Sequence, residues 1–92
     1  MIDRITQNEE RLDKLLISVR KLDEAIDDFV SNKRNLNKLK RYYGSKSWFK
    51  DKEAYEKGQI KHVKAGVLCE DAVWDVLDEI DEIKAKIKKN LL

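Results

Sequence analysis

Residues 39–58, LKRYYGSKSWFKDKEAYEKG, decide how the chain folds, because two glycines punctuate a sequence that is otherwise suited to helices. Glycine takes the left-handed conformation that ends a helix without a steric penalty. Gly44 is therefore predicted to end a long helix, and Gly58 to close a short one over residues 47–57. Ser47 is predicted to cap this short helix. Three aromatic residues would form its inner face: Trp48, Phe49 and Tyr55.

Upstream of this corner, apolar residues recur at heptad spacing, which is typical of a helix that packs against another helix. One heptad position holds Ile5, Leu12, Val19 and Ile26, and the other holds Leu15, Leu22, Phe29, Leu36 and Tyr43. The pattern predicts one helix over residues 3–43. Its weakest part is the polar run SNKRN at residues 31–35, so the sequence alone leaves open whether this helix is continuous or broken there.

Downstream of the corner, a second heptad pattern predicts a helix over residues 70–90. Acidic residues in its first turn and lysines in its last turns match the helix dipole. The pattern-forming residues are Val73, Val76, Ile80, Ile83 and Ile87.

These elements predict an all-α fold in a single domain, residues 1–92. We expect the long N-terminal helix to pack antiparallel on the C-terminal helix as a coiled-coil-like hairpin. The short aromatic helix would close the corner, with Trp48 and Trp74 together filling the open end.

The composition restricts the classes of function. With 20 basic and 18 acidic side chains the net charge is only +2, so the whole molecule is not drawn to nucleic acid or anionic membrane. A single cysteine cannot form an internal disulfide, and the charged sequence MIDRITQNEERLDK lacks the apolar stretch of a signal peptide. No apolar run is long enough for a bilayer. We therefore expect a cytoplasmic protein without a membrane role.

Several motifs follow one another along the chain: YYGS at 42–45, Trp48, Asp51, Gly58, GVL at 66–68, EDAV at 70–73 and Leu77. In this order they resemble the bacterial domain-of-unknown-function family 4298. Cys69 stands where that family tends to have serine, and Lys46 and Lys50 stand where it tends to have acids. The family has no assigned activity, so the resemblance implies a small helical fold rather than a function.

Residues 33–50 carry seven cations and no acid, with aromatic rings among them, as in proteins that bind single-stranded nucleic acid. Residues 70–82 carry seven acids and no base. In an antiparallel hairpin these two segments would face each other, so we favour internal charge matching. Nucleic-acid binding through residues 33–50 is kept as the alternative function.

Catalysis and metal binding are not expected. Cys69 and His62 form no recognisable nucleophile and base pair, and we expect Cys69 to be a small buried thiol. The carboxylates Asp71, Asp75 and Glu79 share a helical face, yet a lone acidic face is more often solvated or paired with cations. We therefore predict a non-enzyme without catalytic residues, metal or cofactor.

The sequence predicts a protein-interaction module with two contact surfaces. Unidentified protein partners would bind the corner, where we expect the ring of Tyr42 to be exposed. The predicted contact residues at the corner are Tyr42, Ser45, Trp48 and Asp51. The helix over residues 70–90 is too short to cover the first half of the long helix, so we favour a second copy that covers it in a homodimer. The alternative is a long helix broken at residues 31–35, whose N-terminal half folds back to give a compact monomeric bundle. The predicted dimer interface comprises Ile5, Leu12, Leu15, Leu16 and Val19.

Overall fold

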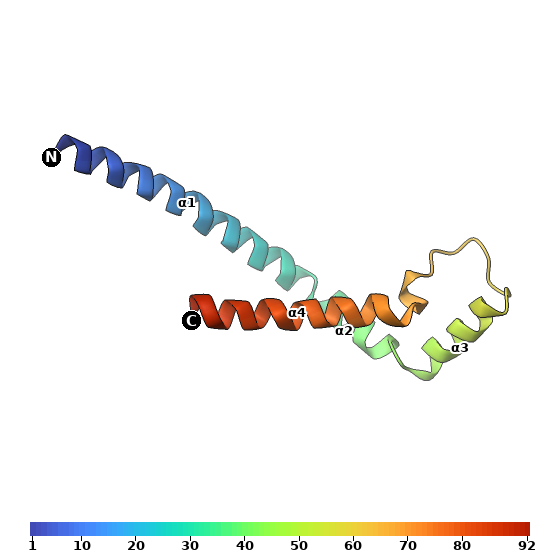
Figure 1. Cartoon of the computed structure of the whole chain (residues 1–92). Coiled ribbons are helices and arrows are strands. Elements are labelled where there is room, and N and C mark those ends of the chain that lie inside the picture. Colours follow the sequence, from blue (N-terminus) through green and yellow to red (C-terminus); the bar gives the residue numbers. More distant parts are fainter. The chain divides into compact units, whose positions relative to one another are not determined.

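The computed structural model describes residues 1–92, and it confirms the all-α prediction (Figure 1). There are four α-helices, one short 3-10 helix and no strand. In chain order the elements are α1 (Ile2–Ser31), α2 (Lys33–Tyr42), α3 (Lys46–Glu56), the 3-10 helix η1 (Gly66–Leu68) and α4 (Glu70–Leu91). None of the helices combines the length and the apolar content that a bilayer-spanning segment requires.

The chain divides into two compact units, Met1–Lys38 and Leu39–Leu92, which we call unit 1 and unit 2. The predicted single domain, the antiparallel hairpin and the charge matching between residues 33–50 and 70–82 all concern how these units combine, and they stay predictions.

Unit 1 consists of α1 and the first part of α2. The helix predicted over residues 3–43 is interrupted at Asn32, within the polar run where the sequence left a break open. The Asn32 backbone N–H donates to the Phe29 carbonyl, three residues back, at 3.0 Å. The Asp28 carbonyl, its partner in a regular helix, instead accepts from two side chains, Ser31 Oγ at 2.6 Å and Asn32 Nδ2 at 3.1 Å. Figure 1 shows the resulting interruption between α1 and α2.

No residue of α1 is buried. Unit 1 offers no second element that packs beside this helix, so its apolar stripe has no cover within the unit.

Unit 2 begins with the last part of α2, and in the turn between α2 and α3 Gly44 takes the predicted left-handed conformation (φ 76°). Ser45, not Ser47, caps α3, and its Oγ accepts a hydrogen bond from the Trp48 backbone N–H at 3.2 Å. The predicted cap was wrong by two positions, because Ser45 has the extended backbone of a capping residue (φ −73°, ψ 168°). Gly58 follows the end of α3 with φ 71°, as predicted.

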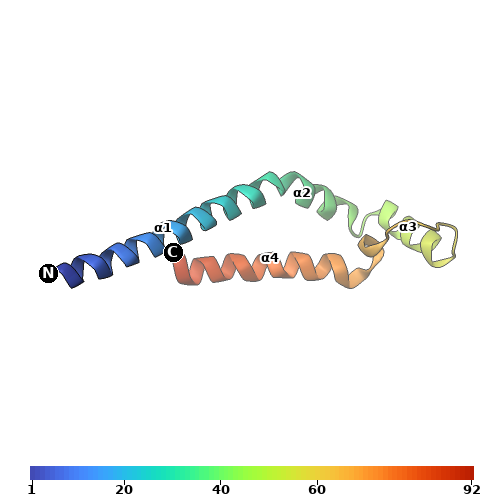
Figure 2. The ribbon, with the colours of Figure 1, turned by 90° about the horizontal axis from the view of Figure 1, so that it is seen from above.

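After α3 the chain turns back, so that η1 lies beside α3 and next to the start of α4 (Figures 1 and 2). α4 agrees with the predicted helix, and it has Glu70 and Asp71 in its first turn and Lys88 and Lys89 in its last. Cys69 precedes α4, but its thiol makes no capping hydrogen bond. The predicted burial of this thiol is wrong, since Cys69 is exposed.

Candidate functional site

Trp48 is the centre of unit 2. Only Trp48 and Val73 are fully buried, each 3% exposed. The Trp48 Nε1–H donates to the Val67 carbonyl at 2.9 Å, which ties α3 to η1. The rings of Tyr43 and Phe49 meet Trp48 edge-on, with centroid distances of 5.1 and 4.9 Å. This arrangement suits the positive edge and negative face of aromatic rings.

Trp74 does not share this core. It is 58% exposed, so the predicted Trp48–Trp74 plug is wrong, and Tyr43 and Phe49 provide the neighbouring rings instead. The predicted inner face of α3 is only partly right. Trp48 is buried, but Phe49 and Tyr55 remain exposed.

Two polar interactions connect the corner, residues 39–58, to the start of α4. The Tyr43 hydroxyl donates to the Glu70 carbonyl at 3.0 Å. Lys52 Nζ lies 2.7 Å from Glu70 Oε1 and 5.3 Å from the centroid of the Trp48 ring. This hydrogen bond raises the pKa of Lys52 and lowers that of Glu70. Both side chains reach solvent, so the pair orients the elements more than it stabilises them.

The four residues predicted to bind a partner come together in unit 2, but each has a structural role. The Tyr42 hydroxyl donates to Asp51 Oδ2 at 2.6 Å, and this bond raises the pKa of Tyr42 to about 12. Ser45 caps α3 and Trp48 fills the core. The expectation that Tyr42 is exposed is wrong, because Asp51 reaches it from the second turn of α3 and leaves it half-buried.

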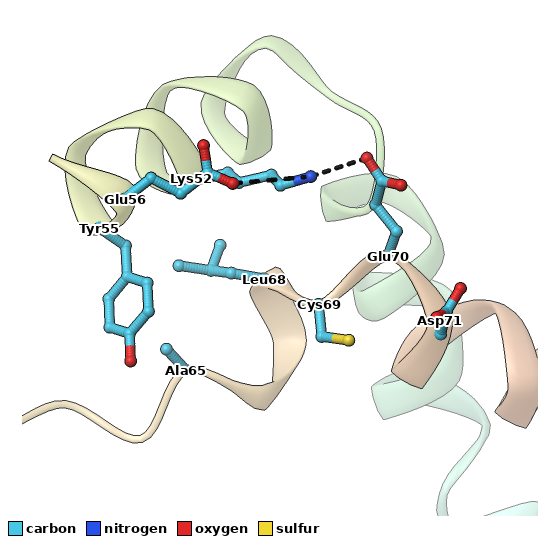
Figure 3. Close-up of a pocket in the computed structure, with 8 residues that line it drawn as sticks. All are labelled: Lys52, Tyr55, Glu56, Ala65, Leu68, Cys69, Glu70 and Asp71. Carbon is cyan, nitrogen blue, oxygen red and sulfur yellow. Dashed lines mark hydrogen bonds and ion pairs between the residues drawn. The ribbon is translucent and has the colours of Figure 1, made fainter.

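A shallow pocket of about 380 Å³ lies between α3 and the segment leading into α4 (Figure 3). Lys52 and Glu70 meet across its rim, and Tyr55, Ala65 and Leu68 supply apolar lining. Cys69 and two further carboxylates, Glu56 and Asp71, complete the wall. No group of three or more side chains is arranged to hold a metal ion.

Sequence reasoning missed Lys52 and Glu70 as the pair that joins α3 to α4. A signal was present, since Lys52 stands one helical turn after Trp48 and Glu70 opens the EDAV motif. No sequence pattern shows that η1 brings α3 and the start of α4 together.

The predicted dimer-interface residues lie on α1 in unit 1, away from the pocket residues in sequence. All are exposed, from 43% for Leu16 to 62% for Leu15. They comprise Ile5, Leu12, Leu15, Leu16 and Val19.

Comparisons with known proteins identify a family. The model of the family described as "Domain of unknown function (DUF4298)" matches residues 5–89, and so covers most of both units. No curated protein and no solved structure matches the chain.

Proposed function

The chain belongs to the family described as a domain of unknown function (DUF4298), and we propose that it acts by protein association rather than by catalysis. The observation that carries this proposal is the exposed apolar stripe of α1, which has no cover within unit 1. Apolar surface left in water costs about 25 cal/mol per Å², so a stripe of this length favours association. We also propose a cytoplasmic location, which the single cysteine supports.

The proposed partner for this stripe is a second copy of the chain. Leu12, Leu15 and Val19 occupy heptad positions, which is the spacing that two helices need to interlock. The residues beside them carry both signs of charge, so a two-fold antiparallel pair can place acids opposite bases. These flanking residues are Glu9, Glu10, Arg11, Asp13 and Lys14.

Sedimentation equilibrium at micromolar concentration tests the homodimer. We expect a species of about twice the 10.9 kDa chain mass. Leu15→Asp should convert it to a monomer, because it places a charge inside the paired stripe. The matched control is Ile17→Asp, which changes an equally exposed residue on the opposite side of α1 and should leave the dimer intact.

Two results would contradict the homodimer. One is a wild-type chain that stays at 10.9 kDa. The other is an equal loss of dimer in the Leu15 and Ile17 variants, which would show that the stripe is not the interface.

Nucleic-acid binding is the alternative function, and one observation favours it. The four cations of the basic stretch that lie in unit 2 form no ion pair: Lys40, Arg41, Lys46 and Lys50. Against it, Trp48 is buried and Tyr42 is held by Asp51, which removes two rings that would stack on bases.

Titration with single-stranded DNA and RNA distinguishes the two functions. We expect no complex at about 0.15 M salt. A tight complex that weakens steeply with salt and is lost in Lys40→Glu/Arg41→Glu would favour the alternative.

A further inference from the structure

The interruption at Asn32 occurs without the residues that usually break a helix. The chain contains no proline, and the nearest glycine is Gly44. Helix breaks have identifiable causes, and here the cause is side-chain competition for backbone groups. Ser31 and Asn32 both donate to the Asp28 carbonyl, while Asn35 Nδ2 donates to Asn32 Oδ1 at 3.1 Å on the other side.

A bond of the same kind at Asn8 shows that a single one is not sufficient. Asn8 Nδ2 donates to the Arg4 carbonyl, four residues back, at 2.8 Å. Yet α1 continues unbroken from Asn8 to Ser31. The break at Asn32 therefore depends on the combined side chains of Ser31, Asn32 and Asn35.

The backbone at Asn32 is close to a regular helix. Its dihedral angles, φ −94° and ψ 0°, need only a modest rotation to reach helical values near −63° and −42°. The Leu36 N–H still donates to the Asn32 carbonyl at 3.0 Å, as in an α-helix. The Asp28 carbonyl keeps hydrogen-bond donors and the Asn32 N–H keeps an acceptor, so the interrupted and regular forms differ little in the hydrogen bonding of these two groups.

The apolar pattern continues across the break in one register. Phe29, Leu36 and Tyr43 are spaced by seven residues, as if the helix were continuous. A regular conformation at Asn32 would therefore align the apolar residues of α1 with those of α2 along one face.

We propose that Asn32 is a hinge, at which the chain exchanges between the interrupted helix and one continuous helix through α1 and α2. Exchange at the hinge changes the angle between α1 and the first part of α2, and with it the direction that the apolar stripe of α1 faces. It does not depend on the identity of the partner, and so it does not require the homodimer.

Distance measurements between spin labels within unit 1 test the hinge. Lys21→Cys and Lys38→Cys are exposed positions on either side of Asn32, and Cys69→Ser removes the native thiol. In a continuous helix these positions are separated by about 26 Å along the axis. Dilution with unlabelled protein removes distances between copies. For the otherwise native chain we expect two populations, one near this value and one shorter.

The variant Ser31→Ala/Asn32→Ala/Asn35→Ala removes the competing side chains and supplies a strong helix former. We expect the shorter population to disappear and one narrow distance to remain. Asn8→Ala is the matched control, because it removes the same kind of bond from an unbroken helix, and it should leave both populations in place.

A single narrow distance in the native chain would overturn the hinge, since it would show a fixed conformation at Asn32. A shorter population that persists in the triple variant would overturn it as well, because the three side chains would then not cause the break.

Discussion

Trp48 joins more of unit 2 than any other side chain, through two rings, a carbonyl and a cation. Trp48→Ala is expected to lower the free energy of unfolding by about 3–5 kcal/mol, because it leaves a cavity in a small core. Urea unfolding followed by circular dichroism measures the loss. Phe49→Ala, at a residue 60% exposed, is the control and should cost much less. Equal losses in both variants would show that Trp48 is not the centre of the core.

Tyr42 makes stability depend on pH in the alkaline range. Its pKa is about 12 in the folded chain, whereas an unfolded tyrosine titrates near pH 10. Between these values the folded state binds more protons than the unfolded state, so the contribution of Tyr42 is complete below pH 10 and is lost as the pH rises towards 12.

Tyr42→Phe is therefore expected to flatten the fall in unfolding free energy between pH 9 and about pH 11. Urea unfolding at the two pH values measures this difference in unfolding free energy. Tyr55→Phe is the control, because it keeps the Tyr42–Asp51 bond. The same pH dependence in Tyr42→Phe and wild type would show that the bond does not persist in solution.

At the scale of elements, glycines define where the helices of unit 2 end. Gly44 and Gly58 have positive φ, whereas Gly66 does not, and a Cβ at any of the three would meet nothing within 4 Å. Gly44→Ala should therefore cost about 1–2 kcal/mol from backbone strain alone. Gly66→Ala is the matched control without this strain. Thermal unfolding compares them, and equal melting temperatures would contradict the assigned turn.

The helices could largely be predicted from the sequence, but their local ends could not. The lack of proline, the heptad spacing and the charges at the ends of residues 70–90 predicted the number and type of the long elements. The sequence marked residues 31–35 as the weakest part of the first helix, but it did not show that the break would fall at Asn32, because the bonds that Ser31 and Asn32 donate to the Asp28 carbonyl leave no periodic pattern. Ser45 and Ser47 were indistinguishable as caps, because the backbone conformation that selects one of them depends on the turn at Gly44.

The candidate site was less predictable than the fold. Tyr42, Ser45, Trp48 and Asp51 all lie in unit 2, yet the sequence does not show that Asp51 would accept a hydrogen bond from the Tyr42 hydroxyl. The pocket depends on the path of residues 57–65, which contain few apolar anchors and no periodicity. A pattern of residue types predicts which faces are apolar, but not which loop returns to which helix.

At the scale of the whole molecule, self-association predicts that stability depends on protein concentration. If unfolding separates the two copies, a tenfold rise in concentration stabilises the folded dimer by about 1.4 kcal/mol. Thermal unfolding followed by circular dichroism over a hundredfold range measures the shift in melting temperature. Leu15→Asp should abolish the dependence. A wild-type melting temperature that does not change with protein concentration would contradict coupled folding and association.

The exposed helix α1 is synthesised before the residues of unit 2, and this order has a consequence for association. α1 is held by local backbone hydrogen bonds, whereas the corner in unit 2 needs residues as far apart as Tyr43 and Glu70. On a ribosome, α1 therefore emerges and can become helical before the residues that close the corner have been translated. If the chain pairs through α1 as proposed, neighbouring ribosomes on one message would present several such helices close together, and nascent chains from the same transcript would pair first.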